Sequence, residues 1–183
     1  MRVISGQAKG RRIKVPKGRA LRPTADRVKE ALFNILPRDL SGLRVLDLFA
    51  GTGNLSVEAL SRGAAEALLV DASREAGKAM RENLQAMSFS ARSRVWTSPV
   101  LRSLRLLSRR GETFDLIFLD PPYDKGWIGQ VLRVVAQAGL LAPAGIVVVE
   151  HSVREKVEEN YGPLSLRDQR RYGTTLISFF RYP

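Results

Sequence analysis

The sequence predicts an α/β protein built on a mostly parallel β-sheet, and three observations favour this class. From residue 44 onward, strand-like apolar segments alternate with segments of helical periodicity, as in parallel strands joined by helical crossovers. The strand-like segments are short and almost continuously apolar, for example "RVLDLFA" and "GIVVVEHS", which is typical of strands buried on both faces. The last segment, 164–182, reads instead as an antiparallel pair of strands.

The first 36 residues have a different pattern. Residues 2–15 alternate loosely around glycine and predict a small basic β-hairpin, and residues 23–36 have apolar side chains at helical spacing before Pro37. We therefore expect a basic extension over 1–36 and a main unit over 37–183, together forming one globular unit. The later elements expected are strands at 44–50, 66–72, 93–98, 114–120 and 145–152, helices at 55–63, 73–87, 100–110 and 127–141, and the antiparallel pair.

Composition excludes several classes of protein. The 183-residue chain is 44% hydrophobic but has no apolar run long enough to cross a bilayer and no secretory signal at its start. Cysteine is absent, which excludes disulfides and thiolate metal sites. The single histidine, His151, cannot form a histidine-based metal site. We expect a cytoplasmic protein, a monomer, with no membrane partner and no metal.

Charge is distributed unevenly along the chain. The net charge is +12, and residues 1–44 carry twelve basic and three acidic side chains, so most of the excess lies in this segment. Arginine predominates over lysine, and its planar fork suits phosphate groups. A basic, merely solubilising surface remains an alternative, but the asymmetry favours a polyanion-binding end and a nucleic acid partner.

Candidate functional residues collect where strands end. "DLFAGTG" follows the first strand of the main unit, Asp71 ends the second, and "DPPY" follows the strand at 114–120. In an open parallel sheet, ligands bind at the carboxyl ends of the strands. Three carboxylates (Asp47, Asp71 and Asp120) and a glycine turn are therefore expected to share one crevice.

The glycine turn does not match a phosphate-binding loop. Ser56 stands where a G-x-G-x-x-G fingerprint needs its third glycine, and no G-K-[ST] follows. Gly51 and Gly53 permit a tight turn with close approach of backbone to a ligand, and Asp71 can accept hydrogen bonds from ribose hydroxyls. An acidic nucleoside site without phosphate contacts fits S-adenosylmethionine, which carries an amino acid group and a positive charge.

The segment "DPPY" predicts a rigid clamp for a flat ligand. Two prolines fix the backbone after Asp120 and donate no hydrogen bond. The carboxylate of Asp120 and the ring of Tyr123 are thereby held still on either side of Pro121 and Pro122. A fixed acid beside a fixed ring suits a nucleobase with polar edges.

These motifs carry a family resemblance. "DLFAGTG", "VDAS" and "LDPPY", in this order, resemble class I S-adenosylmethionine-dependent methyltransferases that act on exocyclic amino groups. The segments "RVISGQAKGRRIKVP", "LRPTADRVKEALFNIL" and "RRYGTTLISFF" are similar to the ribosomal RNA small-subunit methyltransferase D family, which methylates N2 of a guanine in 16S rRNA. The resemblance implies a Rossmann-like fold with a mostly parallel seven-stranded sheet, a C-terminal antiparallel strand pair and an N-terminal β-hairpin. It implies 16S rRNA, or the assembling small ribosomal subunit, as partner.

The resemblance also implies roles for particular residues. Asp120 and the Pro121 carbonyl would accept hydrogens from the target amine, Tyr123 would stack on the base, and Pro122 completes the catalytic segment. The expected cofactor-binding residues are Asp47, Phe49, Gly51, Gly53, Asp71, Ala72 and Asp120. The expected RNA-binding residues are Arg2, Lys9, Arg11, Arg12, Lys14, Arg22, Thr24 and Arg27.

Two alternatives remain, and one position departs from the family. A DNA amino-methyltransferase (adenine N6 or cytosine N4) shares "DPPY" but normally needs a target-recognition region, and a non-catalytic RNA-binding module could retain the fold. Family members usually have an acidic residue and then a small one after the strand at 93–98, where this chain has Ser98 and Pro99. That departure implies weaker contact with the adenine of the cofactor.

Overall fold

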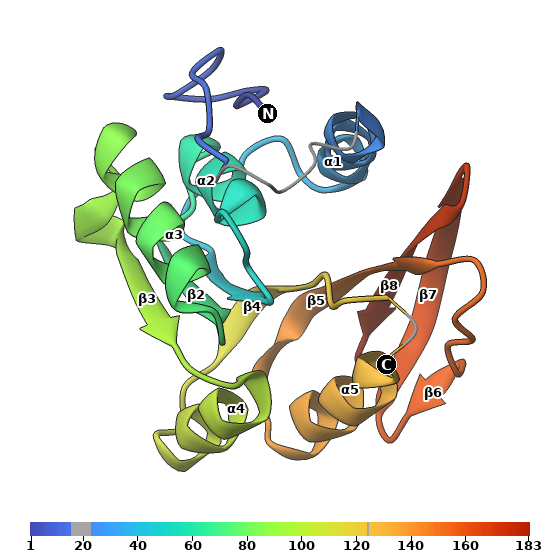
Figure 1. Cartoon of the computed structure of the whole chain (residues 1–183). Coiled ribbons are helices and arrows are strands. Elements are labelled where there is room, and N and C mark those ends of the chain that lie inside the picture. Colours follow the sequence, from blue (N-terminus) through green and yellow to red (C-terminus); the bar gives the residue numbers. More distant parts are fainter. Residues whose placement is uncertain (16–22, 124) are drawn as a thin grey trace.

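The structure is a computed structural model that describes residues 1–15, 23–123 and 125–183. In the first helix, side chains are described from residue 27 onward. One eight-stranded sheet crosses the molecule in the order β3-β2-β1-β4-β5-β8-β7-β6 (Figure 1). The helices are α1 (Pro23–Ile35), α2 (Asn54–Ser61), α3 (Arg74–Ala86), α4 (Val100–Arg109) and α5 (Trp127–Gln137), with a short 3-10 turn at Ser90–Arg92. The strands are β1 (Arg44–Leu48), β2 (Glu66–Asp71), β3 (Ser93–Thr97), β4 (Phe114–Leu119), β5 (Leu141–Ser152), β6 (Asn160–Tyr161), β7 (Leu164–Tyr172) and β8 (Thr175–Arg181).

The sheet confirms the predicted α/β class. Strands β1 to β5 pair in parallel, whereas β8 runs antiparallel between β5 and β7. The expected number of seven strands is one too low, because the two residues of β6 pair with the start of β7. A two-residue strand is too short to produce a period in the sequence.

One helix boundary was also predicted wrongly. The helix expected over 127–141 ends at Gln137. Gly139 then takes a positive φ of 62°, a conformation that ends helices readily because glycine has no Cβ. The chain turns there, and Leu141 already belongs to β5.

The expected N-terminal hairpin is present only in reduced form. A single antiparallel bridge joins Arg2 to Arg12, and turns occupy most of the segment between them. The backbone groups of this segment bind helix α2 in place of a second strand: Gln7 N donates to the Ser61 carbonyl and Ala8 N to the Ser61 hydroxyl. Gly6 permits this close approach, since an added Cβ would lie 1.8 Å from the Ser61 carbonyl oxygen.

Helices cover both faces of the sheet. Figure 1 shows α1, α2 and α3 on one side and α4 and α5 on the other. Each side has its own apolar core, and strand residues alternate between them: in β4, Phe118 packs on the α1 side and Ile117 on the α5 side. Val3, Ala8 and Ile13 belong to the α1-side core, so the N-terminal segment shares its core with the main unit. None of the helices in the described ranges is long and apolar enough to cross a membrane.

A buried carboxylate joins the N-terminal segment to the two helices beneath it. Glu58 of α2 is 0% exposed. Its two oxygens accept hydrogen bonds from the backbone N–H groups of Ile4 and Ser5, at 2.8 and 3.1 Å. They also face the Nζ of Lys29 at 3.6 Å and accept from the Nε of Arg62 at 2.9 Å. Every charge in this cluster is thus paired, which buried charges require.

We predict that Glu58→Ala destabilises the protein strongly. The substitution leaves the cations of Lys29 and Arg62 buried without their carboxylate and removes the acceptor of two N–H groups. Breaking a buried ion pair from one side costs about 3–5 kcal/mol, measurable as a lower free energy of unfolding in urea. Glu158→Ala is the matched control, because the Arg133–Glu158 pair is 53% and 60% exposed and should contribute less than about 1 kcal/mol. Equal losses in the two variants would contradict the prediction.

Candidate active site

The predicted site residues meet at one edge of the sheet. Leu48, the last residue of β1, lies opposite both Val70 of β2 and Leu119 of β4. Phe49, Asp71 and Asp120 follow these three residues, so the carboxyl ends of three neighbouring strands bring them together. This is the edge at which ligands bind in open parallel sheets.

The glycine turn between β1 and α2 has an unusual backbone. Phe49 has a positive φ of 62°, and Gly51 and Gly53 have values of 58° and 77°. Such a conformation in a bulky residue is strained and is found mostly at functional sites. The turn is secured by two hydrogen bonds, from Ala50 N to the Val70 carbonyl at 3.0 Å and from Gly51 N to Asp71 Oδ2 at 2.9 Å.

Asp47 supports this turn from below. Its side chain is buried, and Oδ2 accepts hydrogen bonds from the N–H of Ser56 at 3.2 Å and from its hydroxyl at 2.7 Å. Burial raises the pKa of Asp47 to about 7, and the charge of Asp71 adds to the increase. Asp47 precedes Leu48 within the strand, whereas Asp71 and Asp120 stand at or just beyond their strand ends. Asp47 therefore fixes the first turn of α2 and does not reach the surface of the edge.

Asp71 is partly exposed at the end of β2. One carboxylate oxygen accepts from Gly51 N, and the other accepts from Ser73 N at 2.8 Å. Ala72 follows and is exposed. Ser98 lies beside this pair, since its N–H donates to the Asp71 carbonyl at 2.9 Å. The position that departs from the family pattern is thus part of the same edge.

The segment after β4 extends the edge toward β5. Asp120 is exposed, Pro121 is buried and Pro122 is exposed. Tyr123 is partly buried, and its hydroxyl donates to Glu150 Oε1 at 3.0 Å and lies 3.5 Å from the Thr175 Oγ1. Burial raises the pKa of Tyr123 to about 12, with the charges of Glu150 and Asp120 adding to the shift. The phenol therefore stays protonated near neutral pH and keeps its hydrogen bond.

Glu150, Thr175 and Trp127 belong to the site but were not predicted from the sequence. Glu150 follows the apolar run "GIVVV" as Asp120 follows its own strand, so the same signal was available. Trp127 packs against Phe49, with the two rings tilted and their centroids 5.5 Å apart. In the sequence, Trp127 could have been recognised as an aromatic residue directly after Gly126. Thr175 has no local signal, because it reaches Tyr123 only through the pairing of β8 with β5.

The expected RNA-binding residues of the N-terminal segment lie outside the edge itself, but the segment reaches the glycine turn, because Asn83 Nδ2 donates to the carbonyls of both Lys14 and Thr52 at 3.0 Å. The N-terminal segment packs on α2 and α3: Lys14 N donates to Asn83 Oδ1, and the Arg11 guanidinium donates to the Ala86 carbonyl. Its side chains Arg2, Lys9, Arg11, Arg12 and Lys14 are all exposed, as is Arg27 of α1. Arg22 and the side chain of Thr24 lie outside the described residues.

The titratable groups do not gather into a metal site. Within the ranges 1–15, 23–123 and 125–183, no group of three or more His, Asp or Glu side chains is placed to hold a metal ion. His151 is buried in β5, where Nε2 lies 2.8 Å from the hydroxyl of Ser178, and burial lowers the pKa of His151.

Comparison with known proteins assigns the chain to a class and a family. A solved structure described as putative methyltransferase yhhF from Escherichia coli superposes with a TM-score of 0.86 at 32% identity, covering 100% of this chain and 97% of that one. A putative SAM-dependent methyltransferase from Streptococcus mutans, with a TM-score of 0.71 at 17% identity and coverage of 87% and 49%, shares the fold. The strand order and the turn after β1 define a class I S-adenosylmethionine-dependent methyltransferase.

The family follows from the sequence relatives. The chain belongs to the family described as conserved hypothetical protein 95, whose model matches residues 1–181. Putative rRNA methyltransferase YlbH of Bacillus subtilis is 36% identical over 99% of this chain and 98% of its own length. Ribosomal RNA small subunit methyltransferase D of Escherichia coli is also 36% identical, over 84% of this chain and 75% of its own length.

The edge is suited to the cofactor of this class, S-adenosylmethionine. The carboxylate of Asp71 lies beside the glycine turn, where Gly51 is partly buried, and Asp120 and Glu150 add negative charge along the edge. These acids favour a cationic sulfonium and ribose hydroxyls, and they disfavour phosphate. Phe49 and Trp127 provide an apolar wall next to Gly51.

We predict that Tyr123 and Glu150 are energetically coupled. Tyr123→Phe removes the hydroxyl that donates to Glu150 Oε1, and Glu150→Ala removes the acceptor. In a double-mutant cycle measured by urea denaturation, the two changes should be non-additive by about 0.5–1.5 kcal/mol, the usual net value of a hydrogen bond. If the losses in free energy of unfolding of the two single variants simply add up in the double variant, the hydrogen bond contributes nothing to stability. The control, Tyr182→Phe, should change the free energy of unfolding by less than about 0.5 kcal/mol.

A second prediction concerns pH and Asp47. Its pKa rises from 3.8 to about 7 on folding, so between these values the folded chain binds the proton more tightly than the unfolded chain. The stability contributed by this group therefore falls as pH rises from about 4 to 7. Asp47→Asn should leave stability nearly unchanged at about pH 4 and increase it above about pH 7, in urea titrations across that range. A difference that is constant with pH would contradict the assignment.

Proposed function

We propose that this methyltransferase modifies the exocyclic N2 amine of a guanine in 16S rRNA, during maturation of the small ribosomal subunit. The observation that carries the proposal is the rigid segment Asp120–Tyr123 at the cofactor edge, with the tyrosine ring fixed at its hydroxyl by Glu150 and Thr175. The relatives from Bacillus subtilis and Escherichia coli are named as rRNA methyltransferases, which supports an rRNA substrate. The choice of guanine as the target base rests on the resemblance of the sequence to the ribosomal RNA small-subunit methyltransferase D family.

The residues of the edge would act mainly by orientation. The N2 amine of guanine is a weak nucleophile, because its lone pair is delocalised into the ring. In our proposal the Asp120 carboxylate accepts one hydrogen of the amine and the Pro121 carbonyl accepts the other. The nitrogen lone pair is then directed at the methyl carbon. Alignment of this kind contributes on the order of 7–11 kcal/mol at best.

Methyl transfer itself needs no covalent enzyme intermediate. S-adenosylmethionine supplies an electrophilic methyl group: the bond from nitrogen to the methyl carbon forms while the bond from that carbon to sulfur breaks. The methylated amine then releases one proton, for which Asp120 is the acceptor at hand. Tyr123 holds the base by stacking, an interaction worth about 1–3 kcal/mol per base. If the guanine is stacked in the RNA, swinging it out costs a few kcal/mol.

In the same proposal, each part of the edge has one task. Asp71, Ala72 and the turn with Phe49, Gly51 and Gly53 bind the cofactor, and Asp47 positions that turn. Ser98 in place of an acid weakens the hold on adenine. Residues 1–36 are the RNA-contacting extension and 37–183 the catalytic unit of a cytoplasmic monomer. The residues that contact RNA are Arg2, Lys9, Arg11, Arg12, Lys14, Arg22, Thr24 and Arg27.

We predict that Asp120→Ala abolishes methyl transfer and leaves RNA affinity nearly unchanged. The carboxylate acts on the amine, whereas RNA affinity depends on phosphate contacts elsewhere. The measurement is transfer of labelled methyl groups from S-adenosylmethionine to 16S rRNA, to small subunits and to duplex DNA, followed by nucleoside analysis of the product. N2-methylguanosine supports the proposal. Methylated adenine or cytosine in DNA would indicate a DNA methyltransferase, and binding without transfer a non-catalytic module.

A further inference from the structure

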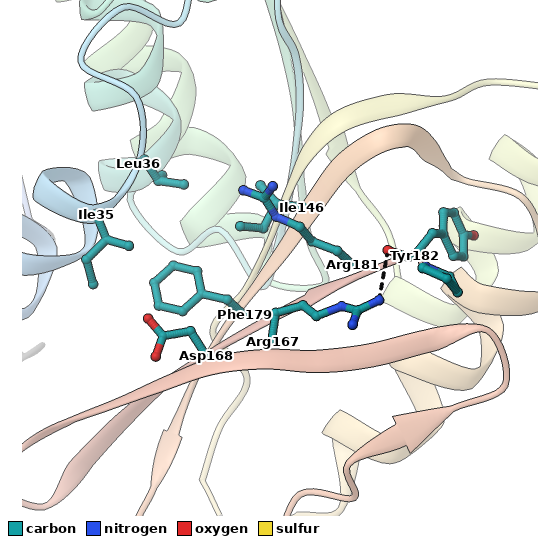
Figure 2. Close-up of a pocket in the computed structure, with 9 residues that line it drawn as sticks. Ile35, Leu36, Ile146, Arg167, Asp168, Phe179, Arg181 and Tyr182 are labelled. Atoms are coloured by element: carbon teal, nitrogen blue, oxygen red, sulfur yellow. Dashed lines mark hydrogen bonds between the residues drawn. The ribbon is translucent and has the colours of Figure 1, made fainter.

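A groove lies at the end of the sheet opposite to Asp120 and Tyr123. It has a volume of about 500 Å³ and is bounded by Ile35 and Leu36 at the end of α1, by Ile146 of β5 and by Phe179 of β8. Arg167 of β7 and Arg181 at the end of β8 stand on its rim, and Figure 2 shows both beside the apolar floor. We refer to it as the α1–β7 groove. Its volume is in the range of pockets that hold a nucleotide-sized ligand.

The apolar surface that the groove exposes belongs mainly to Ile35, because Leu36 and Phe179 of the floor are buried. Ile35 is 41% exposed, and few large apolar side chains of the described part are this accessible. Figure 2 shows Ile35 and Leu36 facing the ring of Phe179 across the opening. A flat, partly apolar group such as a nucleobase would cover this surface and remove it from water.

The rim of the groove is cationic. Arg167 and Arg181 are exposed, and the carboxylate of Asp168, which also lines the groove, is paired with the Nε of Arg170 at 2.9 Å. Because Arg170 compensates Asp168, the two rim arginines leave a net positive charge. The guanidinium of Arg167 also donates to the Tyr182 carbonyl at 3.3 Å, and this hydrogen bond holds the side chain at the rim. Guanidinium groups beside an apolar slot complement a phosphate attached to a base.

One face of the sheet connects this groove with the edge that carries Asp71, Asp120 and Tyr123, which we call the catalytic edge. Glu150, Ile177 and Arg170 lie opposite one another across β5, β8 and β7, and directly paired residues share a face. Strand β8 begins at Thr175, which contacts Tyr123, and ends at Arg181 on the groove. Six residues of strand span about 20 Å. On this face the β8 residues Ile177 and Phe179 are buried, whereas Tyr172 and Arg170 of the adjoining β7 are accessible. A single strand of RNA that left Tyr123 over these two β7 residues would reach the groove after a few nucleotides.

We infer that the α1–β7 groove binds a second nucleotide of the substrate RNA, a few positions from the methylated base, with its base on Ile35 and its phosphate between Arg167 and Arg181. The inference rests on the proposed RNA substrate and adds a contact that the catalytic edge and the N-terminal segment do not provide. With this second contact, the enzyme selects a stretch of single-stranded RNA and not an isolated guanine.

The test compares two double variants of the full chain that remove equal charge. Arg167→Ala/Arg181→Ala empties the rim, and the control Arg171→Ala/Arg105→Ala removes two exposed arginines of β7 and α4 that do not line the groove. Initial rates of methyl transfer are measured with deproteinised 16S rRNA that lacks the modification, and also with a guanosine-containing dinucleotide, which is too short to span both sites. A third variant, Ile35→Asp, places an opposing charge on the floor without touching an arginine.

We expect the rim variant to raise the KM for rRNA about five- to tenfold, as two exposed charge contacts would. Its kcat and its KM for S-adenosylmethionine should stay within about twofold of wild type. The dependence of log affinity on log salt should become shallower by about 0.7, the value for the one phosphate of a single strand that the variant no longer neutralises. Ile35→Asp should act in the same direction, and the dinucleotide should not distinguish any variant from wild type.

Two results would overturn the inference. If the rim variant and the control change the KM for rRNA equally, the groove does not bind RNA, although the proposed function stands as long as wild type forms N2-methylguanosine. An effect on kcat, or on the rate with the dinucleotide, would show that the arginines act through the fold of the catalytic edge. If wild type transfers no methyl group to rRNA or to small subunits, the proposed function fails first, and the inference fails with it.

Discussion

The arrangement of the molecule depends on the buried carboxylate of Glu58. It holds two backbone N–H groups of the N-terminal segment, the ammonium of Lys29 in α1 and the guanidinium of Arg62 in its own helix. Arg62 in turn stacks on Phe33, 4.8 Å from the ring centroid, and donates to its backbone carbonyl. Three segments that are distant in the sequence therefore form one unit on one face of the sheet. This cluster is one of the links that hold the basic side chains near the N-terminus in place beside the cofactor edge, and Asn83, which binds the carbonyls of Lys14 and Thr52, is another.

The catalytic edge is made rigid in a similar way, by contacts between separate elements. Prolines restrict the backbone between Asp120 and Tyr123, and Glu150 with Thr175 fixes the far end of the tyrosine ring. Asp47 secures the glycine turn from beneath by binding both the N–H and the hydroxyl of Ser56. Rate enhancement by orientation needs groups that are already in place before the substrate arrives. The structure meets this need with hydrogen bonds from Glu150, Thr175 and Asp47.

Much of this organisation could be predicted from the sequence, because strand ends leave local signals. An apolar run that stops at a carboxylate located Asp71 and Asp120, and two glycines directly after a strand located the turn that follows β1. Residues whose importance depends on pairing between distant strands left no such signal. Thr175 lies 52 positions from Tyr123 along the chain, and β6 is too short to show a period. The reduced hairpin also follows from contacts between distant residues. The N–H groups of Ile4, Ser5 and Ala8 bind Glu58 and Ser61 of α2 rather than a strand partner.

The antiparallel placement of β8 has a consequence for the order of events during synthesis. The ribosome delivers β1 to β5, with the cofactor turn and the Asp120–Tyr123 segment, before β8 exists, and chains begin to fold while they are being made. Strand β8 then inserts between β5 and β7 and brings Thr175 to the tyrosine hydroxyl. The aromatic platform is therefore completed by one of the last elements to emerge. If the proposed function holds, a nascent chain builds its methyl-donor site early and gains a fixed acceptor site only when the sheet is finished.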